Sequence, residues 1–207
     1  MTKKPVSPAA TRTRRTEATS LALEQTPLAA SRAIVAMFID AESSDFTVRQ
    51  MAAHAGISER TFYRYFPTRE DVVRPVIDVG MQSLAAEMAK RPLQEPIIDA
   101  LAHAFRNSWV VVPIERSRIL FSVMNQTETF RAVWRQAMSV GERQWSELIA
   151  QRLQIAPDSH RAILTGAVIS TAVRLSFECA EHDQSKDPGA MFSIFLKLLD
   201  TQLFVLS

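Results

Sequence analysis

The sequence has a single cysteine, Cys179, among 207 residues. One cysteine excludes a disulfide within the chain and is typical of proteins in a reducing compartment. The neighbours of Cys179 in the sequence are mostly apolar, so we expect a buried and unreactive thiol. The disulfide framework of small secreted proteins is therefore excluded.

Sequence features of enzymes and metal proteins are also scarce. The chain has only five glycines, and it contains neither a glycine-rich phosphate loop nor a serine-centred nucleophile elbow. No two of its four histidines have the spacing of metal ligands. Glu178 and His182 lie four residues apart, but a surface pair explains them better than a zinc site. We therefore expect no enzyme activity, no metal and no cofactor.

Long apolar runs and a strong net charge are absent too. No apolar run reaches the ~20 residues of a membrane span, and the basic N-terminus lacks the apolar segment of a secretory signal. We therefore expect a cytoplasmic protein without a membrane partner. The formal charge of +2 is too small to indicate a nucleic-acid partner by itself. Residues 1–75 contain 11 Lys and Arg residues and 8 Asp and Glu residues, whereas residues 76–207 contain 13 and 14.

Helical periodicity fills most of the chain. Segments rich in Ala, Leu, Arg, Gln and Glu repeat apolar residues at helical spacing, which predicts an all-α fold. Thr26 followed by Pro27 is a helix start, and Ala162, Gly166 and Ser170 predict a close contact between helices. Pro75 is placed to bend a helix that begins at Thr68. The expected helices span about 27–41, 48–55, 58–66, 68–90, 96–111, 115–125, 127–153, 158–183 and 188–206.

The segment TVRQMAAHAGISERTFYRYF, residues 47–66, carries the clearest functional pattern. Thr47 and Gln50 form a capping box that starts one helix. Gly56 stands where a residue with positive φ ends it, and Ser58 can cap a second helix. This is the helix-turn-helix pattern, in which the second helix enters the DNA major groove. An ordinary helical hairpin with arginines on its solvated face is the alternative.

The continuation of this segment strengthens the DNA-binding interpretation. Thr68 and Asp71 form another cap around Arg69-Glu70. The sequence resembles the DNA-binding region of the tetracycline-repressor (TetR-like) family of bacterial regulators. Besides Arg69-Glu70, the residues that carry the resemblance are Thr47-Val48, Met51-Ala52, Ala55-Gly56-Ile57-Ser58 and Thr61-Phe62-Tyr63-Arg64-Tyr65-Phe66.

The resemblance implies an architecture. A three-helix, helix-turn-helix DNA-binding module would span residues 25–80, with its motif at 48–67. A fourth helix would join it to a ligand-binding and dimerisation bundle, residues 81–207. The first helix lacks the family's basic residue at its first turn, and the loop 42–46 lacks its glycine.

The resemblance also assigns DNA contacts by position. Arg60, Thr61 and Tyr63 would form the recognition surface. Residues that orient the protein on the phosphate backbone would be Thr47, Arg49, Ser58, Tyr65 and Arg69, because backbone contacts position a protein while base contacts specify the sequence.

The N-terminal segment 1–24 is basic, with five Lys or Arg residues before the first acid, Glu17. Its composition predicts disorder. It is either a solubilising tail or an arm that contacts phosphates or an adjacent minor groove. The resemblance favours the arm.

The last helix is apolar around most of its circumference and must be buried on more than one side. A wholly internal helix in a monomer would satisfy this. The resemblance instead implies a homodimer formed through 158–183 and 188–206.

Large side chains gather in the second half of the sequence and form either plain core or an effector pocket. The candidate pocket residues are Phe105, Trp109, Phe121, Met124, Trp134, Met138, Arg174 and Phe177. Arg131, Arg135 and Arg174 could meet an anionic or carbonyl-bearing ligand, or pair with Glu128, Glu178 or Glu181. The resemblance implies a small effector, and the second half weakly resembles family members that bind acyl-CoA-like ligands.

These expectations combine into one function. The chain would be a homodimeric transcriptional repressor that binds a palindromic double-stranded DNA operator through residues 58–66. A small, largely apolar effector would release it. The alternatives are an activator of the same architecture and a helical interaction protein whose motif no longer reads DNA.

Overall fold

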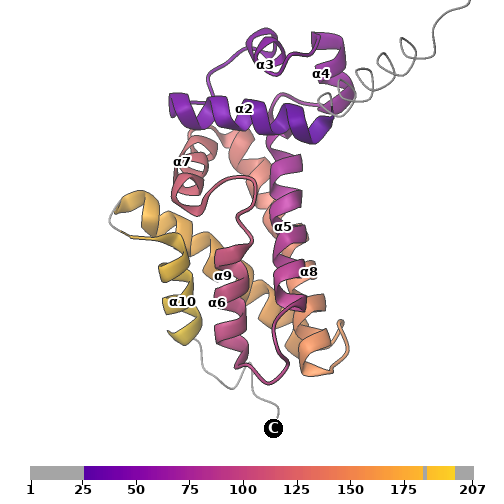
Figure 1. The fold of residues 1–207 in the computed structure, drawn as a ribbon, viewed down its shortest axis with the longest axis vertical. Helices are drawn as coiled ribbons and strands as arrows, with labels where there is room; N and C mark the ends of the chain where they lie inside the picture. Colours follow the sequence, from indigo (N-terminus) through magenta and orange to yellow (C-terminus); the bar gives the residue numbers. More distant parts are fainter. Residues whose placement is uncertain (1–25, 184–185, 199–207) are drawn as a thin grey trace, which may run out of the picture.

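The computed structural model describes residues 26–183 and 186–198, and within these residues the regular secondary structure is entirely helical (Figure 1). The all-α prediction is thereby confirmed. The basic arm 1–24 and the predicted last turns of the final helix, 199–206, lie outside the described residues. The α-helices are α2 (Pro27–Ala41), α3 (Val48–His54), α4 (Glu59–Tyr65), α5 (Arg74–Ala89), α6 (Ile97–Asn107), α7 (Ile114–Asn125), α8 (Glu128–Leu153), α9 (His160–His182) and α10 (Pro188–Leu198).

Helix α2 begins and ends for local reasons. Thr26 accepts a hydrogen bond from the Ala29 amide at 3.1 Å, and Pro27 occupies the first turn, as predicted. The helix ends at Glu42, whose φ of 50° is left-handed. Glycine adopts this conformation at the lowest energetic cost. The loop 42–46 contains no glycine, and Glu42 adopts the conformation instead. The side-chain amide of Gln126 donates to the Glu42 carbonyl at 2.9 Å.

The helix predicted from Thr68 to about Lys90 is divided in two. A 3-10 turn, η1 (Glu70–Val73), precedes α5. The Thr68 amide and hydroxyl donate to the Asp71 carboxylate at 2.9 and 2.8 Å, so the predicted Thr68–Asp71 pair forms, but the Thr68 side chain does not cap a helix. Pro75 lies in the first turn of α5, where its missing N–H costs nothing. The expectation that Pro75 bends a continuous helix is therefore wrong.

Two groups of buried side chains form the core. The first joins α2, α3, α4 and η1 to α7 and the start of α8. The second joins α5 and α6 to α8, α9 and α10. Phe130 of α8 packs edge-on against Phe38 of α2, with ring centroids 5.7 Å apart. The first core therefore crosses the boundary placed near residue 80, and Trp134 contacts both groups.

Helix α9 packs closely along α8. Ala162, Gly166 and Ser170 are all buried, as their spacing predicted. A Cβ atom added to Gly166 would lie 2.5 Å from the Glu142 carbonyl oxygen. Over its 23 residues α9 is long and apolar enough to cross a membrane, contrary to the sequence expectation, but half of its apolar window is buried within the protein. A single helix of this kind is weak evidence of a membrane span, because core helices pass the same test of length and composition.

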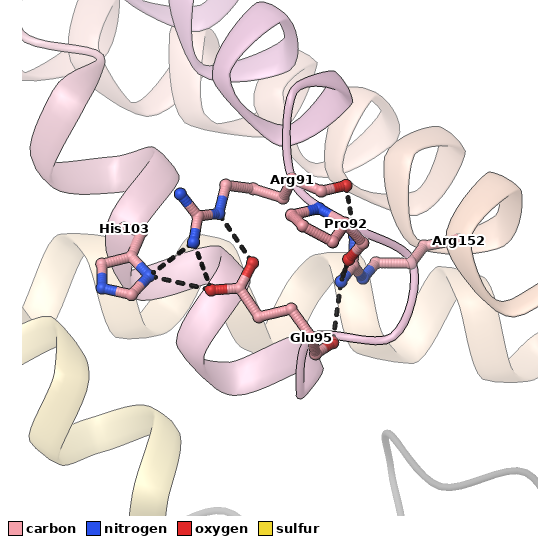
Figure 2. Close-up of polar contacts among 5 residues, drawn as sticks. All are labelled: Arg91, Pro92, Glu95, His103 and Arg152. Carbon is pink, nitrogen blue, oxygen red and sulfur yellow. Dashed lines mark hydrogen bonds and ion pairs between the residues drawn. The ribbon is translucent and has the colours of Figure 1, made fainter.

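A polar cluster fixes the loop between α5 and α6 (Figure 2). Arg91 donates to the Glu95 carboxylate at 2.6 Å, and His103 lies 3.0 Å from the same carboxylate. Arg152 of α8 donates to the carbonyl oxygens of Pro92 and Glu95, at 2.6 and 2.8 Å. These contacts tie the loop to both α6 and α8.

The stability that Glu95 contributes should depend on pH. Its hydrogen bond with Arg91 is the main reason that the pKa of Glu95 falls to about 2, well below the ordinary value of 4.5. A lowered pKa stabilises the fold above the unfolded pKa, and this stabilisation is lost as the pH falls towards the folded pKa. We expect Glu95→Gln to be less stable than the unchanged protein at pH 6. In chemical unfolding, the difference should shrink from about pH 4.5 to pH 2.

Exposed Glu147 provides the control for this measurement. Glu147→Gln should unfold like the unchanged protein throughout the same pH range. A Glu95→Gln deficit that stays constant down to pH 2 would contradict the role given to the carboxylate charge.

Candidate nucleic-acid interface and effector cavity

Helices α3 and α4 form a compact pair at one end of the molecule (Figure 1). The Gln50 amide donates to Thr47 Oγ1 at 3.3 Å and the Thr47 amide donates to Gln50 Oε1 at 2.8 Å, which completes the predicted capping box. Gly56 has φ of 66° in the turn. Ser58 caps α4 by accepting a hydrogen bond from the Thr61 amide at 3.1 Å. The sequence prediction of this motif is confirmed.

The buried face of α4 determines which side chains point outward. Phe62 is fully buried and packs against Phe66, with ring centroids 5.2 Å apart. Met51 of α3 is buried in the same core. Because Phe62 fixes the rotation of the helix, Arg60 and Tyr63 are exposed, and Tyr63 retains 56% of its accessible surface.

The exposed surface of the motif contains five of the eight predicted DNA contacts: Thr47, Arg49, Ser58, Arg60 and Tyr63. Thr61 is half-buried and accepts a hydrogen bond from the Ser58 hydroxyl at 3.0 Å. Arg49, Arg60 and Arg64 form no ion pair with any described residue. Guanidinium groups in this state can bind phosphate oxygens or guanine edges.

Two predicted contacts are less available than these. Tyr65 is half-buried, and the Arg64 guanidinium lies 5.1 Å from the centre of its ring. Arg69 donates to the carbonyl oxygens of Ser44 and Phe46, both at 3.4 Å. Its guanidinium also lies 5.7 Å from the Phe130 ring centre. Arg69 therefore holds the loop before α3 in place. It is not part of the exposed surface formed by Thr47, Arg49, Ser58, Arg60 and Tyr63.

A second feature is an apolar cavity of about 90 Å³ in the other half of the molecule. Among its lining residues are seven of the eight predicted ligand contacts: Phe105, Trp109, Phe121, Met124, Trp134, Met138 and Phe177. Arg174 does not line it, because this side chain donates to Glu178 at 2.6 Å. Arg131 and Arg135 likewise pair with Glu128. For Arg174 the structure therefore shows the alternative that the sequence left open, an ion pair with Glu178.

The sequence interpretation missed two walls of the cavity. One is the inner face of α5, with Val76, Ile77, Gly80, Met81 and Leu84, and the other is the segment 110–112 between α6 and α7. The apolar spacing of α5 predicts an inner face, but whether that face meets a void depends on helices distant in the sequence. No charged side chain of the described part of the chain lines the cavity. Among the described residues, no group of three or more His, Cys, Asp or Glu side chains could hold a metal ion.

Helix α7 connects the cavity to the DNA-binding motif. Leu120, Phe121 and Met124 of this helix line the cavity. At its ends, Arg116 forms an ion pair with Asp40 of α2, and Gln126 accepts a hydrogen bond from the Ser44 amide at 3.4 Å. Helix α7 therefore contacts the cavity, α2 and the loop before α3.

Comparison with known proteins supports the interpretation of the N-terminal part. Residues 32–76 match the model of the bacterial regulatory proteins of the tetR family. The matched segment contains most of α2, both helices of the motif and η1. No curated protein matches the sequence.

Proposed function

We propose that the chain is a DNA-binding transcription regulator of the TetR type, and that it acts as a homodimeric repressor released by a small apolar effector. The match of residues 32–76 to the DNA-binding domain of the tetR family supports the first part of this proposal. The outward face of α4 is the observation that carries the proposal. Its side chains are exposed, partly cationic and held by a fully buried Phe62. A helix presented in this way fits the major groove.

The predicted contact residues of the motif each have a proposed role at the operator. Arg60, Thr61 and Tyr63 read base edges, while Thr47, Arg49 and Ser58 contact phosphates that orient the helix. Tyr65, from its half-buried position, contributes to the same backbone contacts. Arg69 supports them indirectly, because its hydrogen bonds fix the loop that precedes Thr47. The arm 1–24, outside the described residues, would add contacts with phosphates or with the minor groove. The proposed location of the protein is the cytoplasm.

The DNA-binding face can be tested by substitution. An operator would first be selected from fragments of the source genome. We expect Arg60→Ala and Tyr63→Ala each to weaken binding to it by about 1–3 kcal/mol, because each removes a specific contact. Binding would be measured by fluorescence anisotropy at several salt concentrations.

Arg143→Ala provides a matched control, because Arg143 is an exposed arginine of α8 remote from the motif. It should leave operator affinity unchanged. If Arg60→Ala and Tyr63→Ala behave like this control in a folded protein, the proposed recognition face is wrong. If no duplex binds with a salt-dependent affinity, the alternative of a helical interaction protein gains support.

Exposed apolar side chains support dimerisation through the last two helices. On α9, Ile163 and Leu164 retain 53% and 54% of their accessible surface; on α10, Ile194 and Leu198 retain 48% and 75%. A second copy of the chain is the proposed partner, since a two-fold dimer presents two copies of α4. Two recognition helices about 34 Å apart would fit successive major grooves of a palindromic operator.

Coupling between the effector and DNA would pass through α7 and α8. Trp134 of α8 lines the cavity and contacts both core groups. Helix α7 lines the cavity and is bonded to α2 through Arg116 and to the loop before α3 through Gln126. A ligand that moves these side chains would shift α2 and change the separation of the two recognition helices. Only a ligand that binds one arrangement more tightly can shift the equilibrium in this way.

A further inference from the structure

The polar groups of the cavity restrict what it can bind. Besides its apolar and aromatic walls, the cavity is lined by the hydroxyls of Ser108, Ser117 and Ser170. Each hydroxyl already donates to a backbone carbonyl: Ser108 to Phe105 at 2.8 Å, Ser117 to Ile114, and Ser170 to Met138 at 3.3 Å. The three hydroxyl donors are therefore already used in hydrogen bonds within the protein.

Two indole N–H groups are in a different state. Trp109 and Trp134 line the cavity with their rings, and their N–H groups are buried without an acceptor among the described residues. Both rings pack edge-on against Phe177, with centroid separations of 5.2 Å for Trp109 and 6.2 Å for Trp134. An unpaired buried donor is unfavourable, since it has lost its hydrogen bond to water and gained none.

We propose that the effector is a neutral, mainly apolar molecule bearing a carbonyl or ether oxygen, which accepts a hydrogen bond from the indole N–H of Trp109 or Trp134. Because each N–H is buried, binding requires the ring to turn until the N–H faces the ligand oxygen. This inference rests on the proposed function, because it defines the effector class of the same cavity. The apolar walls bind the body of the ligand, and the two indoles distinguish it from a hydrocarbon of equal size.

The same observations argue against an anionic ligand inside the cavity. A charge moved from water into an apolar site needs a partner of opposite sign. In the part of the chain that the structure describes, no lining residue is charged, and Arg174 is outside the lining and bound to Glu178. An acyl-CoA could therefore place only its acyl chain in the cavity, with its phosphates outside.

Three related compounds test the proposal by calorimetry: 1-indanone, indane and indane-2-carboxylate. We expect 1-indanone to bind about fivefold more tightly than indane, as one additional hydrogen bond would provide. The carboxylate should bind at least ~100-fold more weakly than 1-indanone, because of the uncompensated charge. In Trp109→Phe/Trp134→Phe, the ratio of 1-indanone affinity to indane affinity should fall to about one.

A measurement on the unchanged protein guards against misfolding of the double variant. The indole N–H proton resonance of Trp109 or Trp134 should move downfield with 1-indanone and not with indane. The proposal is overturned if no compound binds, if indane binds as tightly as 1-indanone, if the carboxylate binds best, or if neither indole resonance moves. Operator affinity, measured in the presence of each compound, distinguishes the proposed ligand class from the proposed effector role. If 1-indanone binds as expected without weakening DNA binding, the ligand class stands and the effector role fails.

Discussion

A Gly166→Ala variant is expected to lose about 2–3 kcal/mol of stability, equivalent to a melting temperature lower by roughly 4–12 °C. The added Cβ atom would lie 2.3 Å from Ser146 Oγ, 2.5 Å from the Glu142 carbonyl oxygen and 2.9 Å from the Ser146 amide nitrogen. Two of these atoms belong to the α8 backbone, so rotating a side chain cannot relieve the overlap. Helix α9 would have to move away from α8, which weakens the packing of its buried neighbours.

Gly80→Ala is the matched control, because it makes the same change inside helix α5. A Cβ atom at Gly80 would meet no other atom within 4 Å. Alanine in a helix interior is favoured over glycine by about 0.5–1 kcal/mol, so this variant should become slightly more stable. Both would be measured by urea unfolding at one fixed protein concentration. Equal effects of the two substitutions would show that helix propensity, and not the α8–α9 contact, governs Gly166.

Charges placed on the exposed apolar faces of α9 and α10 should abolish dimerisation. Leu164→Glu combined with Ile194→Glu would bury unpaired carboxylates in the proposed interface, and a two-fold axis would repeat each of them. We expect dimer dissociation to increase more than a hundredfold, equivalent to about 3 kcal/mol. Specific DNA affinity should fall with it, because a monomer reads only one half-site. Leu199 and Leu203, which the sequence pattern also suggests for this test, lie outside the described residues.

Sedimentation and anisotropy would follow the two quantities on the same samples. Val140→Glu is the control, since it introduces the same charge at an exposed apolar position of α8. This variant should remain dimeric and bind the operator. The interface assignment fails if the unchanged protein is monomeric at micromolar concentration, or if the double variant sediments as an intact dimer.

The sequence predicted best those features that depend on interactions between neighbouring residues. The caps at Thr26, Thr47 and Ser58 each join a side chain to a backbone amide three positions ahead, and the Thr68 hydroxyl donates to Asp71 over the same spacing. Gly56 was identified because few other residues accept its φ of 66°. Seven cavity residues were found because they are large and apolar at helical spacing.

The remaining features depend on residues that are distant in the sequence. Arg69 was expected on DNA, but its carbonyl partners lie 23 and 25 residues away and its aromatic partner is Phe130. Arg174 shares a helix with Phe177, yet only Phe177 reaches the cavity. The α5 wall and the unpaired indoles arise from how five helices meet, which periodicity within one helix does not determine.

The core shared between the two halves also has a consequence for biosynthesis. Ribosomes release the N-terminal residues first, and domains generally fold in the order in which they emerge. Helices α2, α3 and α4 cannot complete their core at that stage, because it includes Val112, Val123 and Phe130. Nearly two thirds of the chain must therefore be synthesised before Phe38 acquires its edge-on partner. The helix-turn-helix segment therefore remains incompletely packed until the start of α8 leaves the ribosome. In a chain truncated before α8, helix α4 would lack part of the core that supports it.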